Sequence, residues 1–314
     1  MLKVLTVICA CLAFHVPGHG PGTGVLKLFG VIRTGDTAEL ERMLNSGVNP
    51  NDTLDGYSPL MAAALDGTTE EMSILIRHGA NVNYINHDSL TALWLAVPDK
   101  QKTLLLLDNN ADLHIDARGG MTLLNKLAAI PGSASLIQLF IAKGADLEKN
   151  NVGNSLIIRS VISDDTSNLG LFIRLGLDIN REDLSGIPPI VHAAQFHTLS
   201  TLAMLVEHGA KINAVSKRRG MTALMNAARN GDEESVVYLL EHGADAKIVS
   251  KNGYTALTFW GYSETDRPDI TQKMYDQLGK AAFNKADDGA NALYWSEKRG
   301  ETRAVQLLKK YMQQ

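Results

Sequence analysis

A leucine or isoleucine recurs along this sequence at a spacing close to 33 residues, and this period constrains the fold more than any other feature. The recurring residue lies two positions after a serine, threonine, proline or asparagine, at Leu60, Leu93, Leu124, Ile157, Ile190, Leu224, Leu257 and Leu293. A glycine that closes an apolar run keeps the same period, at Gly47, Gly79, Gly144, Gly176, Gly209 and Gly243. Two markers with one period predict short repeats that stack on one another, because a repeat of this size cannot bury its apolar face alone.

Two stretches show the repeat most clearly. Gly220 to Lys247 reads GMTALMNAARNGDEESVVYLLEHGADAK, and Gly56 to Asn83 reads GYSPLMAAALDGTTEEMSILIRHGANVN. Both resemble ankyrin repeats, and the resemblance extends from Val25 to the C-terminus. It implies an all-α fold, an ankyrin-repeat solenoid in which each repeat is a β-turn finger followed by two antiparallel helices, with a cap at each end.

Each marker of the repeat has a physical reason. Thr222 can cap the first helix of its repeat, while Leu224 enters the core. The glycine after the second helix suits a left-handed residue, where a Cβ atom would be strained. Paired alanines carry no bulk and let neighbouring first helices approach closely; they occur at Ala62-Ala63, Ala193-Ala194 and Ala227-Ala228.

The markers divide the chain into about nine helical pairs when both caps are counted. Residues 25–51 carry the pattern of a second helix without a full turn before it, and they are predicted to be the N-terminal cap. The expected boundaries are 25–51 (N-terminal cap), 52–83, 84–116, 117–149, 150–182, 183–215, 216–248, 249–285 and 286–314 (C-terminal cap).

Three repeats depart from the pattern. Ser160-Val161 replaces an alanine pair in one, and Asn110 replaces the closing glycine in another. Trp260-Gly261 replaces the pair in a third, which also carries an insertion from Gly261 to Asp269. At this insertion we expect either a bend in the stack or a projecting loop.

The first 24 residues have the composition of a leader. Met1-Leu2-Lys3 gives a short positive start, Val4 to Phe14 is an apolar run, and His15 to Gly24 is rich in glycine and proline. Eleven residues rise about 16 Å as a helix, too little for a bilayer core of about 30 Å. Residues 1–24 are therefore predicted to be a signal peptide and linker, cleaved after Ala13, Gly22 or Gly24.

This leader predicts export to the periplasm or secretion, as in an ankyrin-repeat protein of bacterial type. Two alternatives stay open: a lipoprotein signal ending at Cys11, and a cytoplasmic protein that keeps its N-terminus. Cys9 and Cys11 are the two cysteines of the chain. The repeats therefore contain no residue for a disulfide, a thiolate metal site or a catalytic thiol.

The sequence argues against enzymatic chemistry, cofactors and metals. It contains no GxSxG, GxxxxGK[ST], HExxH or CxxC motif. Three histidines directly precede a repeat glycine, which predicts helix C-termini rather than a shared metal site; they are His78, His208 and His242. The net charge of −4 also argues against a nucleic-acid binder.

The family resemblance implies that turn tips and exposed positions of the first helices bind a partner protein. Tyrosine and arginine there are the side chains that most often become interface hot spots. Lys217-Arg218-Arg219 with Lys251 forms a basic stripe suited to an acidic partner. The candidate binding residues are Tyr57, Asp66, Arg118, Met121, Phe196, Arg218, Arg219, Arg229, Asn230, Lys251 and Tyr254.

The sequence thus predicts a monomeric, exported, non-catalytic module that binds another protein and neither nucleic acid nor an integral membrane. Two alternatives are kept. One is an inhibitor or immunity-type protein of an envelope enzyme or toxin. The other is an enzyme whose site lies in the irregular repeats, around Val152–Asp165 or Gly261–Asp269.

Overall fold

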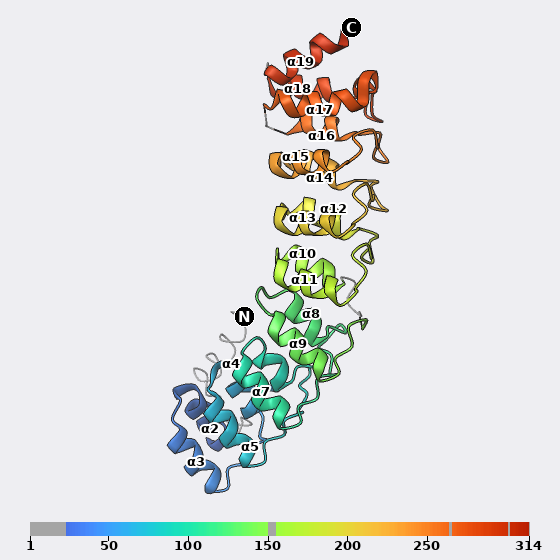
Figure 1. Cartoon of the computed structure of the whole chain (residues 1–314). Helices are drawn as coiled ribbons and strands as arrows, with labels where there is room; N and C mark the ends of the chain where they lie inside the picture. Colours follow the sequence, from blue (N-terminus) through green and yellow to red (C-terminus); the bar gives the residue numbers. More distant parts are fainter. Residues whose placement is uncertain (1–22, 150–154, 264–265, 301, 314) are drawn as a thin grey trace. The chain divides into compact units, whose positions relative to one another are not determined.

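The computed structural model describes residues 23–149, 155–263, 266–300 and 302–313 (Figure 1). These ranges contain eighteen α-helices, or nine pairs, and one 3-10 helix, which agrees with the pair count predicted from the repeat markers. Residues 1–22 of the predicted leader, which include both cysteines, lie outside the described residues. The chain divides into two compact units, Met1–Leu123 with Leu139–Asn151 and Leu124–Gln138 with Val152–Gln314.

Unit 1 is a stack of helical hairpins. Its first helices contact one another in the order α2, α4, α6, and its second helices in the order α3, α5, α7. Their bounds are α2 (Thr23–Thr34), α3 (Thr37–Asn45), α4 (Pro59–Asp66), α5 (Thr69–Arg77), α6 (Ala92–Ala96) and α7 (Lys100–Asp108). Helix α6 is short because Val97 precedes Pro98, and a residue before proline is pushed out of the helical region.

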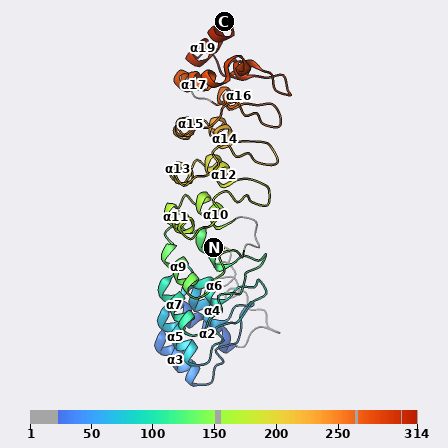
Figure 2. The same ribbon diagram turned by 45° about the vertical axis from the view of Figure 1, so that its right-hand side comes forward.

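Unit 2 repeats the same arrangement. Its first helices α10, α12, α14, α16 and α18 contact one another in order, and so do its second helices α11, α13, α15, α17 and α19. Figure 2 shows these two rows, with the turns projecting on the side of the first helices. The bounds are α10 (Leu156–Ile162), α11 (Thr166–Arg174), α12 (Pro189–Phe196), α13 (Leu199–Glu207), α14 (Ala223–Asn230), α15 (Glu233–Glu241), α16 (Ala256–Tyr262), α17 (Pro268–Leu278), the 3-10 helix η1 (Gly279–Phe283), α18 (Ala292–Arg299) and α19 (Arg303–Met312). Helices α8 (Leu123–Ala128) and α9 (Ala134–Ala142) lie where the sequence passes between the two units.

In six repeats the polar residue two positions before the recurring leucine or isoleucine acts as the helix N-cap. The Thr222 hydroxyl accepts a hydrogen bond from the Met225 backbone N–H at 3.1 Å, as predicted. The same role falls to Ser58, Thr91, Ser155, Thr255 and Asn291 in other repeats. Such a cap satisfies one of the helix's free N–H groups. The polar half of the repeat marker therefore fixes where each of these first helices begins.

Small residues let the first helices of unit 2 pack closely. Ala194 and Ala228 are fully buried in α12 and α14. In α16 the equivalent place is taken by Gly261, where an added Cβ atom would lie 2.6 Å from the Ala292 carbonyl oxygen on α18. Ser160 is also fully buried, and its hydroxyl donates to the Leu156 carbonyl oxygen at 3.0 Å. A serine can therefore replace alanine there without an unsatisfied polar group.

Two positions after the second helix, the chain adopts the left-handed conformation that the glycine marker predicts, in the seven repeats from α3 to α15. Gly243 has a φ of 90°, and Asn110, which replaces glycine after α7, has a φ of 62°. Asparagine tolerates this region better than other residues with a Cβ atom. The irregular repeat therefore ends in the same way as the regular ones.

The N-terminal repeat is a complete helical pair. Residues 25–51 were predicted to be a cap that carries the second-helix pattern without a full turn before it, and α2 and α3 in this part of the chain form one of the nine pairs. Helix α2 begins at Thr23 and buries Leu28, Phe29 and Ile32. This apolar stripe at helical spacing explains why α2 is a helix.

The insertion predicted at Gly261–Asp269 connects three consecutive repeats. The Asp266 carboxylate accepts hydrogen bonds from the Ala304 backbone N–H at 3.0 Å and from Arg303 Nε at 3.1 Å, at the start of α19. The neighbouring Arg267 forms ion pairs with Glu233 of α15 and with Asp269 of α17. The described residues of the insertion therefore lie against the stack.

We expect Gly261→Ala to lower the free energy of unfolding by about 1–3 kcal/mol, because the new methyl group would overlap a backbone oxygen of the next helix. Urea unfolding followed by circular dichroism measures the effect. Gly170→Ala, in the interior of α11, is the matched control, since a Cβ there meets only ordinary contacts. The control should be neutral or more stable by about 0.5–1 kcal/mol. Equal effects of the two variants would contradict the close-packing argument.

Candidate functional site

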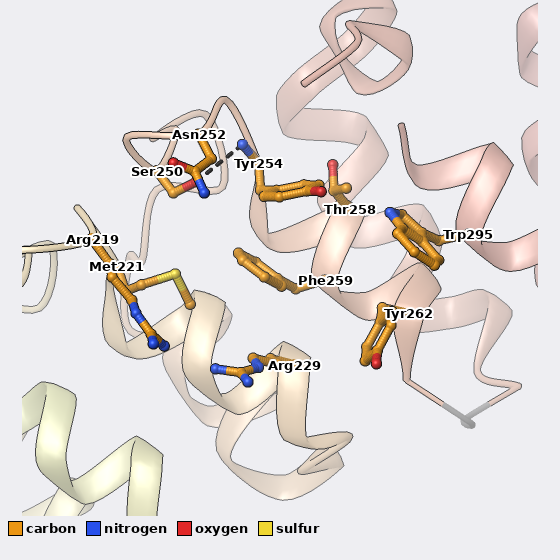
Figure 3. A pocket seen from close by; sticks show the side chains of 10 residues that line it. All are labelled: Arg219, Met221, Arg229, Ser250, Asn252, Tyr254, Thr258, Phe259, Tyr262 and Trp295. Atoms are coloured by element: carbon orange, nitrogen blue, oxygen red, sulfur yellow. Dashed lines mark hydrogen bonds between the residues drawn. The ribbon is translucent and has the colours of Figure 1, made fainter. Parts of the chain in front are cut away.

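The turns and first helices of unit 2 line a concave cavity of about 370 Å³ that is open to solvent. Figure 3 shows side chains from the turns before α14 and α16 and from helices α14, α16 and α18 around one shared space. We call it the aromatic cavity, and its lining consists of Arg219, Met221, Arg229, Ser250, Asn252, Tyr254, Thr258, Phe259, Tyr262 and Trp295.

Aromatic rings form one side of this cavity. Phe259 and Tyr262 lie three residues apart on α16, a spacing that places them on one face of the helix. Tyr262 packs edge-to-face against Trp295 of α18, with ring centroids 5.1 Å apart and an interplanar angle of 82°. Tyr254, from the turn, packs against Phe259 at 5.2 Å. These contacts hold the rings in defined positions on adjacent repeats.

Guanidinium groups form the opposite side. Arg219 and Arg229 are both exposed, and no aspartate or glutamate lines the cavity. Among the described residues, no ion pair or side-chain hydrogen bond engages either guanidinium. The cavity therefore combines an apolar surface with positive charge that has no partner in the described chain.

A second cavity of about 300 Å³ adjoins the first and shares Arg219, Met221 and Arg229 with it. We call it the basic cavity. Its other lining residues are Ser185, Ile187, Val191, Gln195, Ser216, Arg218, Asn226 and Asn230. This lining also lacks a carboxylate, so the positive charge continues from the turn before α14 toward α12.

Backbone hydrogen bonds between consecutive turns support both cavities. The backbone N–H groups of Lys217, Lys251 and Asp287 donate to the carbonyl oxygens of Gly186, Arg219 and Asn252 at 2.9, 3.0 and 3.1 Å. Each bond joins one turn to the next along the stack. The turn side chains therefore project from a connected framework rather than from separate loops.

Tyr254 links two of these turns through its side chain. Its hydroxyl donates a hydrogen bond to the Asp288 carboxylate of the following turn. Partial burial, reinforced by this bond to a carboxylate, raises the pKa of Tyr254 to about 12. The same bond, with help from the Ala290 backbone N–H, lowers the pKa of Asp288.

Five of the predicted binding residues line the two cavities: Arg218, Arg219, Arg229, Asn230 and Tyr254. The Asn230 amide also donates to the Ala194 and Gln195 carbonyl oxygens at 3.2 and 3.3 Å. It therefore closes the C-terminal end of α12 as well as lining the basic cavity.

Other predicted residues of unit 2 lie outside these cavities. Phe196 is 44% exposed and stacks on His192, and Lys251 is exposed on its turn. Lys217, part of the predicted basic stripe, forms an ion pair with Glu182 at 2.5 Å. The stripe is therefore less positive than its sequence suggests.

Four predicted residues belong to unit 1. Tyr57 and Met121 form isolated bridges at turn tips with Leu54 and Ala117. Arg118 forms an ion pair with Asp88 at 3.5 Å, and Asp66 is the last residue of α4. Their part in binding stays a prediction.

Three aromatic residues of the cavity, Phe259, Tyr262 and Trp295, were not among the predicted binding residues. Phe259 and Trp295 each lie two residues after the recurring leucine, and Tyr262 lies five residues after it. Arg229 also lies five residues after Leu224, and that position was selected. The sequence would have indicated these aromatic residues if the positions two and five residues after the recurring leucine had been compared across all repeats.

Several histidines of the described residues form structural contacts. His78, His208 and His242 are C-cap residues, as predicted. His192 Nε2 lies 3.0 Å from Asp183 Oδ2, and Asp183 also accepts bonds from the Ser185 and Ile187 backbone N–H groups, which shapes its turn. Within residues 23–149, 155–263, 266–300 and 302–313, no three His, Cys, Asp or Glu side chains gather closely enough to hold a metal ion. Over the same ranges, every helix is too short or too polar to span a bilayer.

Comparison with known proteins identifies the repeat. The family model described as ankyrin repeats (3 copies) matches residues 28–116 and 190–261. Human Rabankyrin-5 is 28% identical over 180 residues, covering 55% of this chain and 15% of that protein. Human SH3 and multiple ankyrin repeat domains protein 1 is 29% identical over 130 residues, 40% of this chain and 6% of that protein. The Caenorhabditis elegans ankyrin repeat and KH domain-containing protein mask-1 is 27% identical over 259 residues, 80% of this chain and 10% of that protein. The chain thus spans a small part of each of these relatives.

Replacing Tyr254 by phenylalanine should raise the pKa of Asp288 toward its ordinary value, because the carboxylate loses its phenol donor. A lowered carboxyl pKa stabilises the fold above the ordinary value and loses that effect as the pH falls. The variant should therefore lose less stability on acidification than the parent chain. Titration of the Asp288 carboxyl carbon by NMR measures the shift. Tyr262→Phe keeps the Tyr254 bond and should leave the Asp288 pKa unchanged; an unchanged value in Tyr254→Phe would refute the assignment.

Proposed function

This chain belongs to the ankyrin repeat family, and on that basis we propose that it is a non-catalytic module that binds one partner protein on the turns and first helices of unit 2. Ankyrin repeats are generally protein–protein interaction modules. The relatives share repeats with this chain over a small part of their length. Their own partners therefore say nothing about which protein this chain binds.

The observation that carries the proposal is the pair of adjoining cavities. They expose Arg218, Arg219 and Arg229 beside Tyr262, which is 43% exposed. Arginine and tyrosine combine contact area with directed hydrogen-bond donors, and with tryptophan they dominate interface hot spots. The chain as a whole carries a net charge of −4. The two linings are thus positive on a chain that is negative overall, which suits an acidic protein surface.

The His192–Asp183 pair serves its turn, because the Asp183 carboxylate also accepts hydrogen bonds from the Ser185 and Ile187 backbone N–H groups. An inhibitor or immunity-type protein would use the same surface, with an enzyme or toxin as its partner. We therefore treat that role as a special case of protein binding.

Export is a second part of the proposal and rests on the composition of residues 1–24. Helix α2 begins at Thr23, so cleavage after Gly24 would remove its first two residues. Cleavage after Ala13 or Gly22 would leave α2 intact. The exported protein is thus expected to retain Thr23.

N-terminal sequencing of the protein isolated from its own organism should therefore show Phe14 or Thr23 as the first residue. Each of these starts preserves the whole of α2, which packs on α4. A first residue at Met1 would indicate a cytoplasmic protein. A first residue at Val25 would contradict the argument from α2 while supporting export.

Photo-crosslinking tests the binding proposal. A benzophenone amino acid at Phe196, which is 44% exposed beside the basic cavity, should give a covalent adduct with one protein from the source organism, identified by mass spectrometry. The same amino acid at Met312, 57% exposed on α19, is the control and should not give that adduct. Arg218→Ala with Arg219→Ala should reduce the adduct at least tenfold without changing the circular dichroism melting curve. Equal adducts at both positions, or none at Phe196, would refute the binding face.

A further inference from the structure

We propose that the aromatic cavity receives one bulky apolar side chain of an extended, acidic segment of the partner, while Arg219 and Arg229 bind a carboxylate of the same segment. This inference rests on the proposed function and adds the chemistry of the bound segment. It follows from the size of the cavity, from the residues on its two sides and from the groups that are already engaged around it.

The size of the cavity suits a single large side chain. A volume of about 370 Å³ lies at the lower end of the roughly 300–1,000 Å³ range of ligand pockets. Phe259 and Trp295, both half-buried, and the exposed ring of Tyr262 provide an apolar contact surface. An aromatic or large aliphatic side chain can pack against such rings edge-to-face or by stacking.

The charges around the rings exclude a cationic occupant. Lys298 Nζ lies 4.7 Å from the Tyr294 ring centroid and 5.2 Å from that of Trp295. Arg299 Cζ lies 4.9 Å from the Tyr262 ring centroid. Cations of the chain itself therefore already contact these aromatic rings. A lysine or a quaternary ammonium group would also meet Arg219 and Arg229 with no carboxylate in the lining to offset the repulsion.

The two arginines select a carboxylate. A guanidinium presents paired N–H donors that match the two oxygens of a carboxylate. Arg229 lies on α14 and the rings lie on α16 and α18, so the two kinds of contact belong to neighbouring helices. Packed helices lie about 8–10 Å apart, and an extended chain advances about 3.3 Å per residue. The acidic and the apolar residues of the segment should therefore be separated by about three positions.

A nucleotide phosphate is disfavoured by the state of the helix N-termini. Phosphates often bind free backbone N–H groups at the start of a helix. In α14 and α16 the Met225 and Thr258 N–H groups already donate to the hydroxyls of Thr222 and Thr255, at 3.1 Å in both cases. The observations therefore favour a peptide over a mononucleotide, which becomes an outcome of the test.

Panning a phage-displayed library of random twelve-residue peptides against the full chain tests this chemistry. We expect enriched peptides to share an aspartate or glutamate about three positions from a large apolar residue. Their synthetic copies should bind at least tenfold more weakly when the acid is changed to lysine or the apolar residue to alanine. Enrichment of basic peptides, of peptides lacking either feature, or of no peptide would overturn the proposal. Displacement of the selected peptides by adenosine monophosphate would overturn it in favour of a nucleotide site.

A charge swap separates binding from folding. Arg229→Glu changes an exposed residue, so its circular dichroism spectrum should match that of the parent chain. The variant should lose binding to the acidic peptide at least tenfold and should recover binding to the copy in which lysine replaces the acid. Arg33→Ala, an exposed arginine of α2, is the matched control and should change neither affinity. Failure of the swap, with the spectrum unchanged, would show that Arg229 does not contact the carboxylate.

Trp295→Ala tests the apolar side of the cavity. It should weaken binding of the acidic peptide to the parent chain and of the lysine copy to Arg229→Glu.

The crosslinking result distinguishes failure of this inference from failure of the proposed function. An adduct at Phe196 whose attached partner segment is neither acidic nor apolar would refute the inference and leave the binding module intact. Absence of any adduct at Phe196 would refute the module itself.

Discussion

The close approach of consecutive first helices is the constraint on which the rest of this structure depends. Ala194, Ala228 and Gly261 are the small residues that permit it in unit 2, and at Gly261 even a methyl group would overlap the backbone of α18. Because protein interiors are packed at nearly crystalline density, a small change in this spacing is transmitted to neighbouring groups. The small residues at a fixed position of the first helices therefore follow the same period as the recurring leucine.

The proposed binding face depends on that spacing. Closely packed first helices bring consecutive turns near enough for the backbone bonds from Lys217 to Gly186 and from Lys251 to Arg219. Side chains from three repeats can then line one cavity, although each repeat contributes only a few of them. Such a cavity requires no insertion, because the regular repeats already place Arg229 and Trp295 around the same space.

The sequence was sufficient to predict those features of the fold that depend on neighbouring residues along the chain. Thr222 as an N-cap, Gly243 and Asn110 in left-handed conformations, and the histidine C-caps are features of this kind. The cavity depends on residues about 33 positions apart, and its aromatic side was therefore missed at Phe259 and Trp295. The ion pair between Lys217 and Glu182 was also missed, because it joins two turns whose alignment only the stacked structure defines.

The contacts of Asp266 and Arg267 have a consequence for the end of the stack. Within the described chain, the repeat of α18 and α19 packs on one neighbouring repeat, so it would open more easily than the inner ones, since solenoid stability is a sum of nearest-neighbour terms. Here polar contacts from the segment before α17 reach both α15 and α19. Fraying of the last repeat must break these contacts as well as its apolar interface. The final three repeats, which include the helices around the aromatic cavity, are therefore coupled in their opening and should exchange their amide hydrogens as one cooperative block.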